Sequence, residues 1–179
     1  MVSIRLATLD DAAAVTDIYN QGIAERGATF ETQPRTVDGV RTRLQEVERY
    51  PLLVAEQDGA VLGWASLSEY RSRDCYRGIA EFSVYLDAGA RGRGIGKQLL
   101  HALIDAAREK GFWKVLSRVF PFNQASLGAC RASGFREVGR YEKHACLDGH
   151  WLDVVIVERL IAENLVAPTT HLQPTADAV

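Results

Sequence analysis

The sequence predicts a mixed β-sheet flanked by helices, in the α/β or α+β class. Apolar residues recur at helical spacing in some segments and alternate with polar residues in others. These segments follow one another as strand, two helices, three strands, helix, strand, helix and two strands, so helices and strands are interleaved. With 179 residues, 47% of them apolar, the chain is long enough for one domain with a sizeable core, which we expect over residues 1–165.

The N-terminal segments predict one strand followed by two helices. Residues 4–6 have a short strand pattern, and residues 8–11 (Thr-Leu-Asp-Asp) match a capping box at the start of a helix. A second helix is expected over residues 37–47, where valines and a leucine share one face. Residues 51–56 and 60–67 then predict two strands of a hairpin, because the Asp-Gly pair between them favours tight turns.

The second half of the chain predicts the remaining strands and two more helices. After a strand over residues 80–86, a helix is expected from Ile95 to near Gly111, followed by a strand over residues 114–119. Asn123 is a favourable N-cap for a short helix. That helix ends before Gly134, and a final antiparallel pair is expected over residues 135–141 and 150–160. Residues 166–179 contain two prolines but no lysine or arginine, and we expect a disordered tail there.

The composition argues against several classes of protein. A net charge of −2 gives no reason to expect nucleic-acid binding, and no apolar run is long enough to cross a membrane. The start of the chain is too short and mixed for a signal peptide. Cys75, Cys130 and Cys146 have no disulfide or zinc-site spacing, so we expect no metal and a reduced, cytoplasmic setting.

A glycine-rich stretch lies between the strand at residues 80–86 and the helix that follows. Glycines at such a turn let backbone N–H groups approach a ligand, and the helix dipole directs its positive end to the same place. With two arginines and a lysine, the stretch predicts a phosphate or pyrophosphate site, although a surface turn without a ligand is the alternative. The spacing fits neither a Walker A loop nor a dinucleotide fingerprint. Its residues are Arg91, Gly92, Arg93, Gly94, Ile95, Gly96 and Lys97.

The Arg-x-x-Gly-x-Gly pattern of Arg91, Gly94 and Gly96 resembles the pyrophosphate loop of the GCN5-related N-acetyltransferases (GNAT), which bind acetyl-coenzyme A. A second segment, from Asn123 to Phe135, resembles the second cofactor element of that family. The resemblance implies the GNAT fold. It also implies that acetyl-coenzyme A is bound by the glycine-rich stretch and by further residues of the preceding strand and the short helix. These further residues are Val84, Tyr85, Leu86, Asn123 and Ser126.

Other segments resemble the phosphinothricin, methionine sulfoximine and arsinothricin N-acetyltransferases within GNAT. They include residues 29–34, 76, 80–85 and 151–154. Two further segments, residues 112–114 and 149–153, are more similar to the arsinothricin branch than to the other two. This narrower resemblance implies a small amino-acid substrate and a homodimer to which the C-terminal region contributes.

Two residues are candidates for the proton transfers. Glu81 is the expected general base, because burial on an apolar strand would make it a better base; the alternative is a glutamate at a strand start that pairs with an arginine. Cys130 occupies a position where the wider family has a tyrosine and the phosphinothricin group a histidine. Its thiol could protonate the leaving thiolate, or it could be a small buried apolar residue.

The substrate is expected to meet Arg71, Arg73 and Tyr76, because arginines present planar donors to carboxylate, phosphinate or arsinate oxygens. The alternative for this polar segment is a solvated loop. Phe30 and Glu31 are expected to close the pocket from the N-terminal side.

Together with these residues, the resemblance implies an acetyl-coenzyme A-dependent N-acetyltransferase that acts on the α-amino group of a glutamate-like toxin and confers resistance. The candidate toxins are arsinothricin, phosphinothricin and methionine sulfoximine. The alternatives are acetylation of a protein N-terminus or a polyamine, and a non-catalytic sensor that binds acetyl-coenzyme A.

Overall fold

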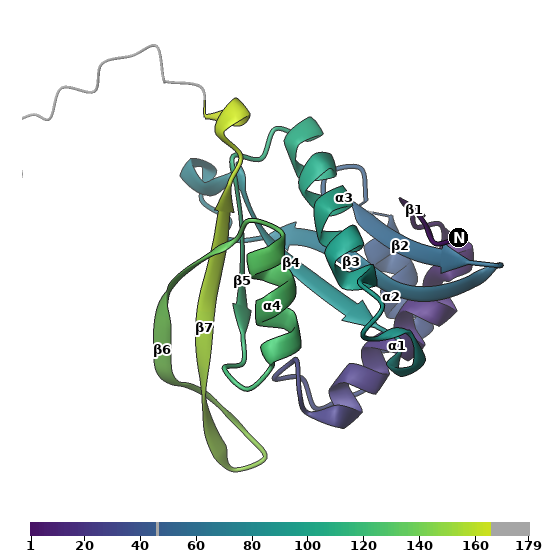
Figure 1. Cartoon of the computed structure of the whole chain (residues 1–179), viewed down its shortest axis with the longest axis horizontal. Helices are drawn as coiled ribbons and strands as arrows, with labels where there is room; N and C mark the ends of the chain where they lie inside the picture. Colours follow the sequence, from purple (N-terminus) through teal and green to yellow (C-terminus); the bar gives the residue numbers. More distant parts are fainter. Residues whose placement is uncertain (46, 166–179) are drawn as a thin grey trace, which may run out of the picture.

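A mixed β-sheet forms the centre of the computed structural model, which describes residues 1–45 and 47–165 (Figure 1). Within these residues the sheet has seven strands in the order β1-β2-β3-β4-β5-β7-β6, and neighbouring strands are antiparallel except β4 and β5. The strands are β1 (Ser3–Leu6), β2 (Leu52–Gln57), β3 (Ala60–Glu69), β4 (Ile79–Leu86), β5 (Lys114–Val119), β6 (Arg136–Leu147) and β7 (His150–Leu160). The predicted mixed sheet is confirmed.

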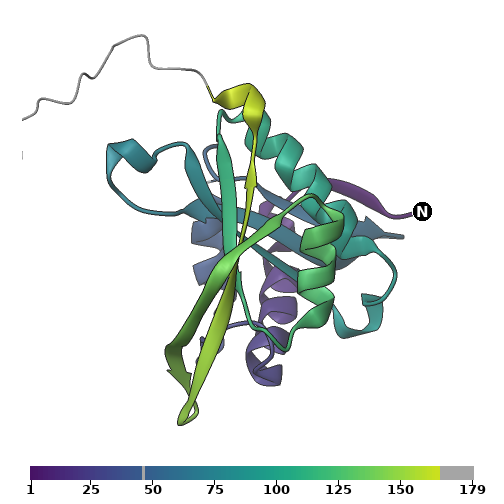
Figure 2. The same cartoon turned by 60° about the vertical axis from the view of Figure 1, so that its left-hand side comes forward.

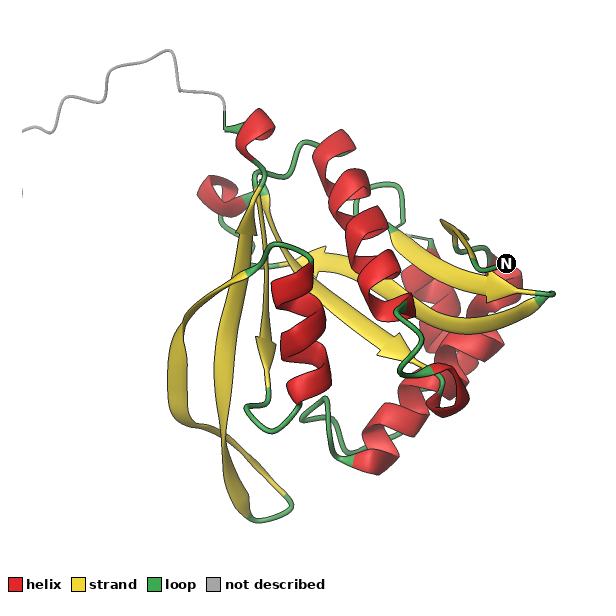
Figure 3. Cartoon of the chain, in the orientation of Figure 1, coloured by secondary structure: helices red, strands yellow, loops and turns green. Residues whose placement is uncertain are grey.

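Helices cover both faces of the sheet (Figure 3). The pair α1 and α2 packs on one face, and α3 and α4 lie on the other. The apolar run of β2 explains this, because its successive side chains point to opposite faces: Leu52 and Val54 join the core under α1 and α2, whereas Leu53 joins the core under α3. The helices are α1 (Ala12–Glu25), α2 (Val37–Leu44), α3 (Ile95–Glu109) and α4 (Gln124–Ala132).

The pairing of β4 with β5 is short, and the candidate active site lies where this pairing ends. The two parallel strands are joined only from Ile79–Lys114 to Glu81–Leu116. Beyond Glu81 they separate, while β4 remains paired with β3 as far as Leu86. The two strands therefore diverge in the middle of the sheet, with α4 beside them (Figure 1).

Several predicted boundaries differ from the structure. The second helix ends at Leu44 rather than at residue 47, and short 3-10 turns at Leu9–Asp11, Asp74–Tyr76, Ala88–Ala90 and Ala162–Asn164 were not predicted. The capping box is present, since the Asp11 carboxylate accepts a hydrogen bond from the Thr8 N–H at 2.7 Å, but it opens a 3-10 turn that leads into α1. The expected tail at residues 166–179 lies outside the described residues.

The last hairpin is longer than the sequence predicts and projects beyond the rest of the sheet (Figure 2). Its first strand continues to Leu147, because the register shifts between Tyr141 and Ala145 and the strand resumes after this bulge. Lys143 has a positive φ of 47° in the bulge, and its N–H donates to Asp153 Oδ1 at 2.7 Å. Among the described helices, none is long and apolar enough to cross a membrane.

Candidate active site

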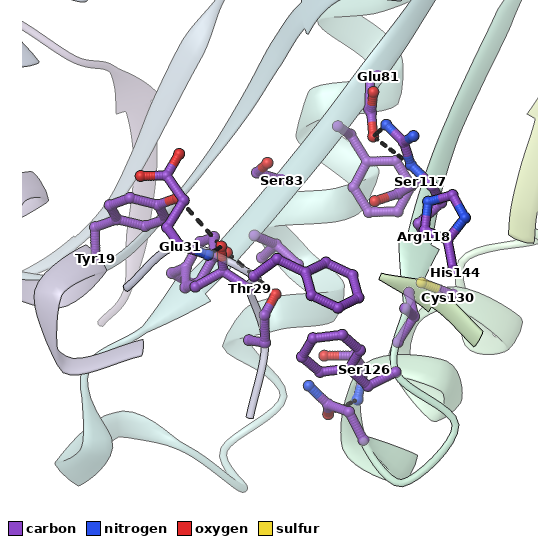
Figure 4. A pocket seen from close by; sticks show the side chains of 18 of the residues that line it. Tyr19, Thr29, Glu31, Glu81, Ser83, Ser117, Arg118, Ser126, Cys130 and His144 are labelled. Carbon is purple, nitrogen blue, oxygen red and sulfur yellow. Dashed lines mark hydrogen bonds and ion pairs between the residues drawn. The ribbon is translucent and has the colours of Figure 1, made fainter. Parts of the chain in front are cut away.

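A cavity of about 530 Å³ opens where β4 and β5 separate (Figure 4). Its walls come from five parts of the fold: α1 and the loop after it, β4, β5 with the turn that follows, α4, and the bulge of β6. The lining residues include Tyr19, Thr29, Phe30, Glu31, Glu81, Ser83, Val84, Tyr85, Ser117, Arg118, Phe120, Asn123, Ser126, Cys130 and His144.

Glu81 and Arg118 form an ion pair at this cavity. Glu81 is the last β4 residue paired with β5, and Arg118 lies two positions beyond its β5 partner, Leu116. Arg118 donates from Nε to Glu81 Oε1 at 3.1 Å and from Nη2 to the same oxygen. The Glu81 side chain is 23% exposed, so its expected burial is only partial. The arginine pairing considered as an alternative is present, and the carboxylate nevertheless faces the cavity (Figure 4).

The loop after α1 closes one side of the cavity. Phe30 stands edge-on to Phe120 of the turn after β5, with ring centroids 4.8 Å apart. Glu31 lines the same side and pairs with Arg35, so both predicted residues lie at the cavity. The Tyr85 hydroxyl donates to the Ala28 carbonyl at 3.3 Å, and burial raises the pKa of this phenol, which keeps it neutral.

The start of α4 forms another wall. Asn123 Oδ1 accepts a hydrogen bond from the Ser126 N–H at 3.1 Å, which is an N-cap, and Asn123 Nδ2 donates to the Gly27 carbonyl at 3.1 Å. One turn further along the helix, Cys130 is 1% exposed and belongs to the main core. Burial raises the pKa of the Cys130 thiol to about 11.

The glycine-rich stretch lies at the far end of β4, beyond Leu86. Gly92 and Gly94 have φ angles of +73° and +76°, which other residues rarely adopt, and α3 begins directly after Gly94. In the part of the chain that the structure describes, no side chain caps α3, in contrast to α4, so its first N–H groups are available to an anion. The charges are partly engaged, because Arg91 contacts Glu25 at 2.9 Å and Arg93 donates to Gln57 at 2.6 Å.

Comparisons with known proteins decide the family. The acetyltransferase (GNAT) family profile matches residues 16–135. The chain belongs to the GNAT family. It is 37% identical over 161 residues to the phosphinothricin N-acetyltransferase of Alcaligenes faecalis, covering 88% of this chain and 81% of the relative. It is 34% identical over 168 residues to the L-methionine sulfoximine/L-methionine sulfone acetyltransferase of Salmonella typhimurium, covering 91% and 96%.

A solved structure shows the same fold with the cofactor. The phosphinothricin acetyltransferase of Sinorhizobium meliloti, in complex with acetyl-coenzyme A, superposes with a TM-score of 0.87 at 32% identity, covering 97% of this chain and 96% of that one. This GNAT protein is therefore an N-acetyltransferase that uses acetyl-coenzyme A. Its own geometry fits the cofactor, because the α3 amides lie beyond one end of β4 and a single cavity is lined by Val84, Tyr85 and Glu81 along that strand. From Leu86 to Glu81 the strand is about 17 Å long.

Three predicted substrate residues lie elsewhere in this GNAT fold. Arg71, Arg73 and Tyr76 line a separate hollow of about 210 Å³ beside Arg49 and Arg77. Arg71 is placed over the rings of Tyr70 and Tyr76, at 5.1 and 5.6 Å from their centroids. These residues belong to the connection between β3 and β4, and none of the three is among the described residues that line the cavity at Glu81.

Arg118, His144 and Tyr19 line the cavity but were not predicted to be site residues. Arg118 is the fifth residue of β5, and its position beside Glu81 depends on the pairing of β4 with β5, which no local motif encodes. His144 comes from the β6 bulge and stacks on Tyr141 with ring centroids 5.2 Å apart. A charged residue in a predicted central strand is the one sequence signal that could have drawn attention to Arg118.

Proposed function

We propose that this N-acetyltransferase acetylates the α-amino group of a small glutamate-like amino acid, and that its substrates include toxins such as phosphinothricin, methionine sulfoximine or arsinothricin. The observation that carries the proposal is the Glu81 carboxylate at the point where β4 and β5 separate, facing a cavity of about 530 Å³. A cavity of this volume suits a small molecule. The names of the two relatives support the substrate class.

Glu81 acts as the general base in this proposal. The α-amino group of an amino acid is mostly protonated at pH 7, because its pKa lies above 7, and it must lose a proton before it can attack the thioester. A carboxylate that accepts this proton, directly or through water, accelerates the reaction by roughly 100-fold or more. The pairing with Arg118 fixes the orientation of Glu81 through one oxygen, Oε1. Acetyl-coenzyme A supplies the acetyl group as a thioester.

Cys130 is a weak candidate for the proton donor to the leaving thiolate. Burial raises its thiol pKa from 9.0 to about 11. Full proton transfer from Cys130 would therefore be unfavourable by about 3 kcal/mol. We propose that Cys130 is a structural residue and that solvent or a cavity neighbour such as His144 protonates the thiolate.

Acetylation of a toxin would abolish the positive charge of its α-ammonium group. A toxin that mimics glutamate would then fit its target enzyme poorly, which accounts for resistance. The further expectations of a cytoplasmic location and a homodimer follow from the resemblance. Exposed Tyr141 and Trp151 on the projecting hairpin offer an apolar surface for a second copy. Light scattering coupled to size exclusion tests the dimer.

A steady-state assay with a panel of acceptors tests the substrate class. The panel contains L-phosphinothricin, L-methionine sulfoximine and L-arsinothricin, a peptide with a free N-terminal alanine, and spermidine. An N-acetylated phosphinothricin serves as the control without a free amine. We expect kcat/KM for at least one of the three amino acids to exceed those for the peptide and spermidine by 100-fold or more, in the range that polar recognition provides. A preference for the peptide or spermidine would overturn the proposal.

A further inference from the structure

Arg118 and Glu81 each have a polar atom that takes no part in the ion pair between them. Both contacts from Arg118, from Nε and from Nη2, go to Glu81 Oε1. Among the described residues, Glu81 Oε2 and Arg118 Nη1 have no hydrogen-bond partner. The Arg118 side chain is 40% exposed and Glu81 is 23% exposed, and both line the cavity. A free acceptor and a free charged donor therefore lie side by side.

The other charged groups at the cavity do not offer the same pair. Glu31 lies on the opposite wall and is paired with Arg35 (Figure 4). His144 lines the cavity from the β6 bulge, where its ring stacks on Tyr141. Arg118 is the one arginine or lysine among the described lining residues. A substrate carboxylate in this cavity would need a cationic partner, because an unpaired charge removed from water is costly.

We propose that Arg118 binds the α-carboxylate of the amino-acid substrate while Glu81 receives its α-ammonium. The two substrate groups are attached to one carbon atom, so they need an acceptor and a donor that are neighbours. Glu81 Oε2 accepts from the ammonium, and Arg118 Nη1 donates to the carboxylate. Arg118 is thereby a specificity residue for free α-amino acids. This inference rests on the proposed function, and it assigns the α-carboxylate to a residue other than Arg71 and Arg73.

The test compares two acceptors that differ only at the α-carboxyl group. L-methionine sulfoximine and its α-carboxamide are assayed with the wild type and with Arg118→Gln and Arg118→Lys. Arg131→Gln is the matched control, because Arg131 forms an ion pair with Glu137 on the surface and does not line the cavity. The ratio of kcat/KM between the two acceptors cancels any general effect on folding or on the orientation of Glu81.

We expect the wild type and Arg131→Gln to prefer the free acid by roughly 10- to 100-fold, the size of one hydrogen bond between charged groups. Arg118→Gln should abolish this preference. Arg118→Lys should restore only part of it, because an ammonium cannot reproduce the planar fork. If Arg118→Gln lowers kcat/KM equally for both acceptors, Arg118 only positions Glu81 and the inference is wrong. A preference that survives in Arg118→Gln but disappears in Arg71→Gln or Arg73→Gln overturns it too.

If the proposed function is wrong, the assay with these two acceptors gives a different result. In that case the wild type turns over neither acceptor, and calorimetric titration of the same two compounds decides the role of Arg118. Tighter binding of the free acid to the wild type, lost in Arg118→Gln, supports the inference without catalysis. Equal binding of the two compounds, or binding of neither, contradicts it.

Discussion

Asn123 Nδ2 donates a hydrogen bond to the Gly27 carbonyl at 3.1 Å and so joins the start of α4 to the turn after α1. Oδ1 of the same side chain caps α4 through the Ser126 N–H. One side chain thus holds two walls of the cavity together. The cap was predicted from the sequence, but the link to Gly27, which spans 96 positions, could not be.

Asn123 variants should separate these two contacts. Serine is also a good N-cap but lacks the amide donor, so Asn123→Ser should lose only the link to Gly27, about 1 kcal/mol. Asn123→Ala should lose the cap as well, and we expect a total loss of about 2 kcal/mol in the free energy of unfolding. Urea denaturation measures both values. Equal stability of the serine and alanine variants would show that the cap contributes nothing.

A second prediction concerns the conformation of the glycine-rich stretch. Gly94→Ala places a side chain on a residue with φ of +76°, which strains the turn and reorients the N–H groups at the start of α3. We expect KM for acetyl-coenzyme A to rise at least 10-fold. Gly111→Ala is the control, because Gly111 has a similar φ of +79° but lies beyond the opposite end of α3, where an added Cβ meets nothing within 4 Å. An equal rise in KM for both variants would mean that strain, not the anion site, is responsible.

The role of Cys130 predicts a small kinetic effect. Because its thiol is buried and has a raised pKa, Cys130→Ala should reduce kcat by less than about 10-fold and leave the pH dependence of kcat unchanged. A true general acid contributes roughly 100- to 10,000-fold. A loss in that range, with altered pH dependence, would restore Cys130 as the proton donor.

The same residue predicts an alkaline loss of stability. The Cys130 pKa is raised from 9.0 to about 11 by burial, so above pH 9 the unfolded state loses this proton before the folded state does. Stability from this group is complete below pH 9 and declines as the pH rises toward 11. Relative to Cys130→Ala, the wild type should lose about 1.4 kcal/mol between pH 8 and pH 10. Parallel stability curves for the two proteins would show that the thiol titrates normally in the fold.

Most of the fold follows from local patterns in the sequence. The hairpin turn at Asp58-Gly59 was predicted from that dipeptide, and both residues have positive φ angles of 53° and 80°. The apolar face of α3 was predicted from its periodicity and is buried in the main core. The length of β6 was missed, because the bulge around Lys143 breaks the alternation that identifies a strand.

Parts of the candidate site could be predicted where the residues concerned lie in one segment of the sequence. The glycine-rich stretch is contiguous, and Glu81 and Asn123 each lie at the predicted edge of a strand or helix. Arg118 becomes a neighbour of Glu81 through the parallel pairing of two strands that are distant in sequence. Arg71 and Arg73 have suitable chemistry and lie close to Glu81 in sequence, yet they line another hollow. Neither the side-chain chemistry of Arg71 and Arg73 nor their closeness to Glu81 in the sequence reveals that they lie in a different hollow from Glu81.

The Glu81→Gln variant shows whether Glu81 removes a proton from the acceptor amine. Glutamine retains the size of the side chain but cannot act as the base. The measurement is kcat for thiol release from acetyl-coenzyme A with a saturating amino-acid acceptor, together with the Kd of acetyl-coenzyme A by calorimetry. We predict a fall in kcat of about 100-fold or more with an unchanged Kd. A variant that retains the wild-type kcat would show that Glu81 is not the general base.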